Sequence, residues 1–266
     1  MYWAIATAAM MLNPTPQAEG LEIRELKLLH APLGPARPGW DFHPLDRLIV
    51  NLSAGGLTAD DKGMCDAELE YRLINPQGVA VGRGGHPVKQ ALAVGSDEAP
   101  CTFMLISPPG SPLGEYTLHV YLHDKLTGRS TEVRQPMDCT RGGLRLAGLL
   151  FTHDPEGKLP CGMVKTVGEV LHFRMGVLGY DRSEGKIQVI TRVELLDADG
   201  TNVYPNPLVR EMKVDDAQTT AKTKHLTFNG TMALSRAGEY RFRITTEDVL
   251  GDTKQVFETP FRVLAP

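Results

Sequence analysis

Apolar residues recur at every second position in several segments of the chain, and turns rich in glycine, proline and aspartate separate these segments. The alternation runs through residues 67–73, 116–122, 171–177, 187–195 and 240–244. Because successive side chains of a strand point to opposite faces of a sheet, each segment predicts a strand with one face on a core and the other in water. No segment shows a sustained helical period with caps. The pattern predicts an all-β protein.

The strand pattern occurs twice along the chain. The apolar run that begins at Leu21 is repeated from Leu144, at an offset of 123 residues. Gly114 and Gly238 each open a Gly-Glu-Tyr triplet, at an offset of 124 residues. A register that holds from the first strand to the last indicates an internal duplication. We therefore predict two tandem antiparallel β-sandwich modules with the same strand order.

The glycines at the centre of the chain place the module boundary. We expect the first module to span residues 20–140 and the second to span residues 144–266, with Gly142 and Gly143 in the junction. A junction this short predicts that the modules touch and form a fixed or narrowly hinged pair. Ligand sites occur preferentially where domains meet, so the groove between the modules is the favoured site for a partner.

The Gly-Glu-Tyr triplets carry a resemblance to a known fold. Tyr116 and Tyr240 each follow a glycine, Gly114 or Gly238, by two residues and open a long alternating strand. This arrangement resembles the tyrosine corner of immunoglobulin-like sandwiches, whose phenol bonds to the backbone of the preceding turn. Over nearly all of residues 20–266, the chain is similar to the tandem immunoglobulin-like or fibronectin-like modules of exported bacterial proteins. The Cys…Trp…Cys spacing of antibody domains is absent, and each module is about twenty residues longer than such a module needs, which implies an eighth strand or extra loops.

The N-terminal residues 1–19 have a different character. Residues 2–12 form an uncharged apolar run with the length of a secretory signal core, too short to span a membrane. No lysine or arginine precedes the run, and a disordered tail is the alternative interpretation. Together with the resemblance, the run predicts an exported protein, whether periplasmic, surface-bound or secreted.

The distribution of charge argues against nucleic acid and lipid surfaces as partners. Residues 1–140 carry 11 basic and 16 acidic side chains, and residues 141–266 carry 17 and 16. Neither half has the clustered basic stripe that a phosphate backbone requires. The opposite signs of the two net charges weakly favour contact between the modules.

Four cysteines are spread along the chain, at Cys65, Cys101, Cys139 and Cys161. They form no C-x-x-C pair, which argues against a zinc site. Their even number allows two disulfides, while cysteine also packs as a small buried side chain. The spacing leaves both alternatives open.

Calcium is the one cofactor that the residue pattern leaves open. Asp197 and Asp199 followed by Gly200 match the first half of a calcium loop, but no bidentate glutamate follows at the required distance. Aspartate and glycine are also ordinary hairpin-turn residues. Asp181 and Glu184 are further weak candidates in a predicted loop, a kind of segment that often carries function.

Histidines provide the remaining candidates for chemistry. His119 and His123 lie on the strand face opposite the apolar positions, so we expect both to face solvent, and a metal site would need a third ligand such as Asp124. Another predicted loop gathers polar side chains, namely His153, Asp154 and Glu156.

The sequence favours binding over catalysis. It contains no nucleophile elbow, zinc-protease motif or phosphate loop. We predict a non-catalytic exported protein that presents its two modules to a partner protein or envelope polymer, as a binding unit or spacer. One alternative is an accessory carbohydrate- or calcium-binding part of an extracellular enzyme system. The only tryptophans are Trp3 and Trp40, which is few for a sugar-binding platform. The other alternative is a periplasmic chaperone-like protein, a class that also has two immunoglobulin-like domains.

Overall fold

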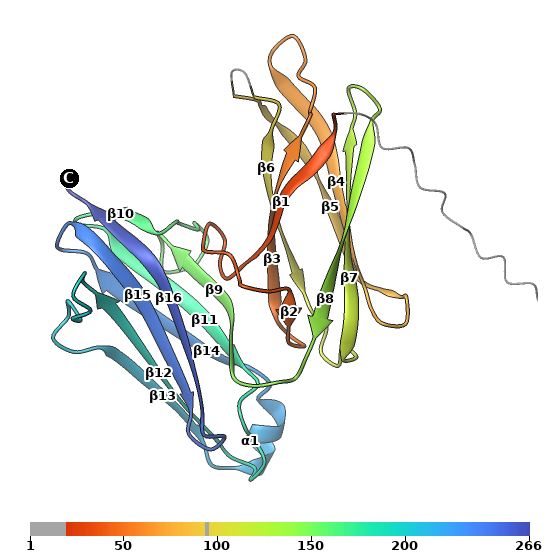
Figure 1. The fold of residues 1–266 in the computed structure, drawn as a ribbon. Coiled ribbons are helices and arrows are strands. Elements are labelled where there is room, and N and C mark those ends of the chain that lie inside the picture. The colour runs from red at the N-terminus through yellow and green to blue at the C-terminus, as the bar shows by residue number, and fades with distance from the viewer. Residues whose placement is uncertain (1–19, 94–95) are drawn as a thin grey trace, which may run out of the picture.

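The computed structural model describes residues 20–93 and 96–266, and this part of the chain folds into two β-sandwiches (Figure 1). The predicted signal segment, residues 1–19, lies outside the described residues. Module 1 contains eight strands: β1 (Glu22–Leu29), β2 (Asp41–Phe42), β3 (Arg47–Gly55), β4 (Met64–Ile74), β5 (Ala80–Ala91), β6 (Ala99–Ile106), β7 (Gly114–Asp124) and β8 (Ser130–Cys139). One sheet has the order β1-β3-β6 and the other β2-β8-β7-β4-β5.

Module 2 repeats this arrangement strand for strand. Its strands are β9 (Arg145–Thr152), β10 (Val164–Thr166), β11 (Val170–Leu178), β12 (Ile187–Leu196), β13 (Leu208–Val214), β14 (Leu226–Ala233), β15 (Gly238–Asp248) and β16 (Thr253–Leu264). The sheets have the orders β9-β11-β14 and β10-β16-β15-β12-β13, so each strand takes the place of the strand eight positions earlier. The predicted identity of strand order is confirmed. The additional strand that the module length implies is the short β2 or β10, which pairs in parallel with β8 or β16.

A short helix distinguishes the second module. Helix α1 (Ala217–Lys222) lies between β13 and β14, and sequence periodicity does not predict it because it is only six residues long. The Asp216 carboxylate begins the helix by accepting a hydrogen bond from the Thr219 amide at 2.8 Å.

Each sandwich encloses its own apolar core, built from the inward-facing positions of the alternating strands. Phe42 and Tyr116 meet edge to face in module 1, with ring centroids 5.2 Å apart. In module 2, Phe151 and Phe173 contact Phe242 in the same geometry at 5.2 and 5.5 Å. All four cysteines are buried in these cores as free thiols.

The two tyrosines of the repeat close the corner before β7 and β15. The Tyr116 hydroxyl donates to the Pro112 carbonyl oxygen at 2.9 Å, and the Tyr240 hydroxyl donates to the Arg236 carbonyl oxygen at 3.0 Å. These are the bonds to the preceding turn that the resemblance predicts. Gly114 adopts a φ of 123°, a backbone conformation that residues with a side chain rarely adopt.

Candidate functional site

The loop between β1 and β3 forms the module 1 side of the junction, and one arginine holds it in place. The Arg37 guanidinium binds both carboxylate oxygens of Asp46, at 2.7 and 3.2 Å, and both side chains are almost completely buried. Arg37 also donates to the carbonyl oxygens of Leu29 and Arg47, at 3.2 and 3.0 Å. Such a two-pronged pair fixes geometry as well as charge. Arg37 therefore ties the loop to the end of β1 and the start of β3.

This loop contacts module 2 through apolar and charged groups. Ala31 is fully buried within the hydrophobic core cluster of module 2. The His30 ring lies edge-on to Phe257 of β16, with centroids 4.8 Å apart. Asp41 forms an ion pair with Arg145 at the start of β9. The two modules touch, as the short junction predicts.

A cavity of about 580 Å³ lies beside these contacts, with walls from both modules. The loop of module 1 between residues 30 and 41 forms one wall, residues 142–146 form its end, and residues 254–258 of β16 form the other wall. We call this cavity the junction groove. Its volume falls within the range of about 300 to 1,000 Å³ that is typical of ligand sites.

The first half of β16 presents a free sheet edge to the junction groove. On its outer side β16 pairs with β10 only at Arg262–Leu264. The Arg262 amide donates to the Met163 carbonyl oxygen, beside β10, at 2.9 Å. Successive residues of a strand direct their backbone groups to alternate sides, so the even-numbered residues of β16 direct theirs away from β15. Lys254, Val256 and Glu258 therefore turn their amide and carbonyl groups toward the groove, with no strand partner in the described part of the chain. Paired backbone groups are the rule in sheets, so this edge can accept another strand.

The charges around the groove are mostly neutralised within the protein. Burial is the main cause that lowers the pKa of His30 to about 4, and the charge of Arg37 adds to it while Asp46 opposes it. His30 is therefore neutral at pH 7. Glu258 pairs with Arg243 on β15. Hydrogen bonding by the free backbone edge and the charge of Lys254 are thus the main polar properties that the groove offers.

The structure does not bring the calcium candidates together. One carboxylate oxygen of Asp197 accepts hydrogen bonds from the amides of Asp199 and Thr201, at 3.1 and 2.8 Å. Asp181 accepts from the amide and hydroxyl of Ser183, which lower the pKa of Asp181. Asp181 and Glu184 precede the ten-residue strand β12, whereas Asp197 and Asp199 follow it, which separates the two pairs by about 30 Å. Within residues 20–93 and 96–266, no three metal-ligating side chains gather.

The expectation that His119 faces solvent is wrong. Its side chain lies on the outer face of the sheet, but only 4% of the residue is exposed. The Tyr121 hydroxyl lies 2.7 Å from Nδ1, and a Glu132 carboxylate oxygen lies 3.0 Å from Nε2. Burial is the main cause that lowers the pKa of His119. Long neighbouring side chains cover this face, while His123 is exposed as predicted.

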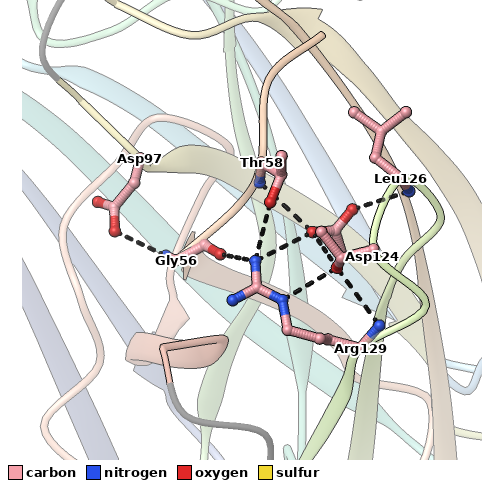
Figure 2. A network of polar contacts seen from close by, with 7 residues as sticks. Gly56, Thr58, Asp97, Asp124, Leu126 and Arg129 are labelled. Carbon is pink, nitrogen blue, oxygen red and sulfur yellow. Dashed lines mark hydrogen bonds and ion pairs between the residues drawn. The ribbon is translucent and has the colours of Figure 1, made fainter.

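Asp124 lies on the core face of β7, opposite the histidines, and forms a polar network shown in Figure 2. Its fully buried carboxylate accepts hydrogen bonds from the Leu126 amide at 3.0 Å, the Thr127 hydroxyl at 2.8 Å and the Thr58 amide at 3.4 Å. Arg129 pairs with it at 3.3 Å and also donates to the Gly56 carbonyl. The network joins the β7–β8 turn to the segment that follows β3. The network has a structural role. The second module retains its central carboxylate, because Asp248 occupies the matching position 124 residues later.

The loop at His153 contains a second network that sequence reasoning did not find. The side chain of Lys165 on β10 is completely buried, with Nζ 2.8 Å from His153 Nδ1 and 3.5 Å from a Glu169 oxygen. Asp154 does not join them, because its carboxylate accepts from the amides of Lys158 and Leu159 in its own turn. A lysine at an alternating strand position gives no signal in the sequence that it is buried.

Trp40, the tryptophan in the described part of the chain, packs partly against the core of module 1. In the described part of the chain, no helix is long and apolar enough to cross a membrane.

Comparison with known proteins yields distant structural similarity alone. No family model matches the chain, and no curated protein matches it. The dimeric latent PorU from Porphyromonas gingivalis is 14% identical with a TM-score of 0.43, over 93% of this chain and 20% of the PorU chain. The C-terminal domain of the Streptococcus agalactiae antigen I/II polypeptide BspA is 14% identical with a TM-score of 0.30, over 91% of this chain and all of that domain. The C-terminal domain of the Streptococcus pyogenes antigen I/II-family protein AspA is 11% identical with a TM-score of 0.29, over 91% of this chain and 99% of that one.

Proposed function

We propose that the chain is a non-catalytic, exported binding protein, and that its junction groove holds an extended segment of a partner protein as an added strand beside β16. The observation that carries this proposal is the free edge at Lys254, Val256 and Glu258, which faces a cavity of about 580 Å³. An extended peptide completes such an edge with main-chain hydrogen bonds and gains specificity from the pockets for its side chains.

The opposite wall of the groove favours an external strand over completion of the sheet by module 1. Pro35 and Pro38 line that wall. Proline has no amide hydrogen to donate, so this stretch of the loop is poorly suited to pair with β16. A strand placed about 4.8 Å from β16 would lie between the two walls. Arg37 anchors the module 1 wall through Asp46, and the Asp41–Arg145 pair ties that wall to module 2.

Binding is favoured over catalysis because the ionisable groups of the groove, apart from Lys254, already have partners or are neutral. Arg37 binds Asp46, Arg145 binds Asp41, and Glu258 binds Arg243. His30 is half-buried and neutral beside Phe257. Acid–base chemistry instead needs a group positioned to exchange a proton with a substrate. Export is supported by the apolar run of residues 2–12 in the sequence.

The test removes one backbone donor from the edge. Peptides of twelve residues are selected from a random library for binding to the whole chain, and their affinities are measured for Val256→Pro and Val256→Ala. Proline at 256 removes only the amide that faces the groove, in the same register that Pro260 already occupies on this strand. We expect Val256→Pro to weaken the selected peptides at least tenfold and Val256→Ala to leave them within threefold. Peptides that bind equally to both variants would refute the added strand.

Hydrogen exchange provides an independent measurement on the unmodified protein. A bound peptide should slow exchange of the amides of Lys254, Val256 and Glu258, because these are the groups that it would bond. Amides of β13, the outer strand at the other edge of the same sheet, serve as the internal control. Protection of β13 in place of β16 would also contradict the proposal.

A further inference from the structure

A second cavity, of about 220 Å³, lies where module 1 meets the outer face of the β9-β11-β14 sheet. On β11, Phe173 and Met175 alternate toward the core, so Arg174 and Gly176 belong to the outer face. Arg47 at the start of β3 and Ile106 at the end of β6 close the cavity from module 1. This site is separate from the junction groove, with which it shares no lining residue.

Two glycines make room for the cavity. Gly148 has a φ of 56°, and a Cβ added there would come within 2.8 Å of Cδ of Arg47. A Cβ added to Gly176 would lie 3.0 Å from the Ala147 carbonyl oxygen. The absence of side chains at both positions allows Arg47 to lie across β9 and leaves the outer face hollow beside it.

The polar groups of the cavity are suited to an anion. Arg47, Arg174 and His225 line it, and the described residues around it include no carboxylate. Arg174 donates through Nε to the Asn229 side-chain oxygen at 3.1 Å, which leaves its terminal nitrogens available. Within the described residues neither Arg47 nor Arg174 pairs with a carboxylate, in contrast to Arg37 beside the junction groove. The remaining lining includes Ile106 and Leu178, so the site combines positive charge with apolar surface.

A smaller hollow of about 90 Å³ continues along the same sheet and shares Arg174 with the cavity. His172, Asn229 and Thr231 line it, and His172 Nδ1 lies 3.2 Å from the Thr231 hydroxyl. These side chains offer hydrogen-bond donors and acceptors next to the charged site. A ligand that ends at Arg47 can therefore continue across the face of the sheet, which favours a chain over a small free acid.

We propose that this face binds the C-terminal end of a polypeptide whose last residue is apolar. The terminal carboxylate would bind Arg47 and Arg174, because a guanidinium matches a carboxylate with two parallel hydrogen bonds. The last side chain would occupy the apolar part, since a volume below about 300 Å³ is small for a whole drug-sized ligand. The preceding residues would extend past Arg174 toward the hollow at His172.

Calorimetry with defined peptides tests the proposal. The probes are hexapeptides that end in leucine with a free carboxylate, the same peptides with an amidated end, and isovalerate as the free acid. We expect the carboxylate peptides to bind at least tenfold more tightly than either the amides or isovalerate. Arg47→Gln and Arg174→Gln should each weaken the carboxylate peptides about tenfold, whereas Arg210→Gln on β13, outside the site, should leave binding unchanged.

Three results would overturn the proposal: equal binding of acid and amide peptides, equal binding of isovalerate and the acid peptides, or equal binding by Arg47→Gln and the unmodified protein. Val256→Pro should bind the acid peptides normally, because β16 does not line this cavity. The failure of this site and the failure of the junction groove are therefore distinguishable. Thermal unfolding of each variant verifies that the modules remain folded.

Discussion

Replacing Asp124 with asparagine should destabilise module 1 more than the matching change destabilises module 2. The substitution preserves the shape of the side chain but exchanges one acceptor oxygen for an amino group. One carboxylate oxygen accepts from the Leu126 amide, and the other is approached by Thr127, Thr58 and Arg129. In either orientation, the new amino group would face at least one donor.

The magnitude follows from the burial of the carboxylate. Hydrogen bonds to a charged group contribute about 1.5 to 3 kcal/mol, and removing one partner of a buried ion pair costs about 3 to 5 kcal/mol. The Arg129 side chain is 27% exposed, so water compensates part of its loss. We expect a loss of about 3 kcal/mol in the free energy of unfolding. Asp248 accepts from the amides of Asp181 and Gly251, and in the described part of the chain it makes no ion pair. Asp248→Asn should therefore cost about 1 to 2 kcal/mol.

Urea unfolding measures both variants. Trp40 lies against the core of module 1, so its fluorescence follows that module, while circular dichroism follows both modules. Burial alone would raise the pKa of Asp124, but bonds from Thr127, Leu126 and Arg129 together lower it below its ordinary value of 3.8. The stabilisation is therefore complete above that value and is lost as the pH falls through the lowered pKa. The difference between wild type and Asp124→Asn should shrink below about pH 4. A cost equal to that of Asp248→Asn, or one independent of acid, would refute this reasoning.

Three further changes test the other networks and the junction. Tyr240→Phe should lower the free energy of unfolding by about 1 to 2 kcal/mol in urea, because it removes the corner bond, and no change would mean that the corner contributes nothing. Glu169→Gln should cost about 3 kcal/mol by the same assay, because the buried ammonium group of Lys165 loses its carboxylate, whereas Glu156→Gln on the exposed loop should cost almost nothing. Since the pKa of His30 is about 4 in the folded chain and 6.5 when unfolded, the unfolded chain binds the extra proton between those values. Stability should therefore fall as the pH drops from 6.5 to 4 in a thermal unfolding series, and His30→Gln should flatten that fall.

The sequence predicts the strands and the repeat because both depend on local patterns. Alternation over a few residues specifies which side of a strand is buried, and the offset from Leu21 to Leu144 persists because both copies keep the same eight strands. Tyr116 and Tyr240 were identifiable for the same reason, since the hydroxyl and its carbonyl partner are four residues apart.

The sequence does not predict the junction groove, because its walls are brought together by long-range contacts. The free half of β16 is defined by where β10 stops, and the position of the opposite wall depends on Arg37 meeting Asp46. His119 shows the same limitation in one side chain. Alternation places His119 and Tyr121 correctly on the same outer face. It does not show that the Tyr121 side chain lies against the imidazole ring, or that Glu132 of the neighbouring strand β8 reaches it.

The duplication itself provides a comparison between two copies of one sheet edge. β8 in module 1 matches β16 and carries Pro136 where β16 has Pro260, at an offset of 124. Glu132 occupies the position on β8 that corresponds to Val256 on β16. Glu132 is tied to His119, and charged side chains on an edge strand discourage pairing with another chain. Val256 is apolar and 51% exposed. Exposure of this side chain to water is unfavourable, and an added strand would cover it. Lys254 and Glu258 carry charges on either side of Val256, so the contrast between the two copies is confined to this central position. There it favours an added strand on the first half of β16, the same edge that the module geometry leaves open to the junction groove.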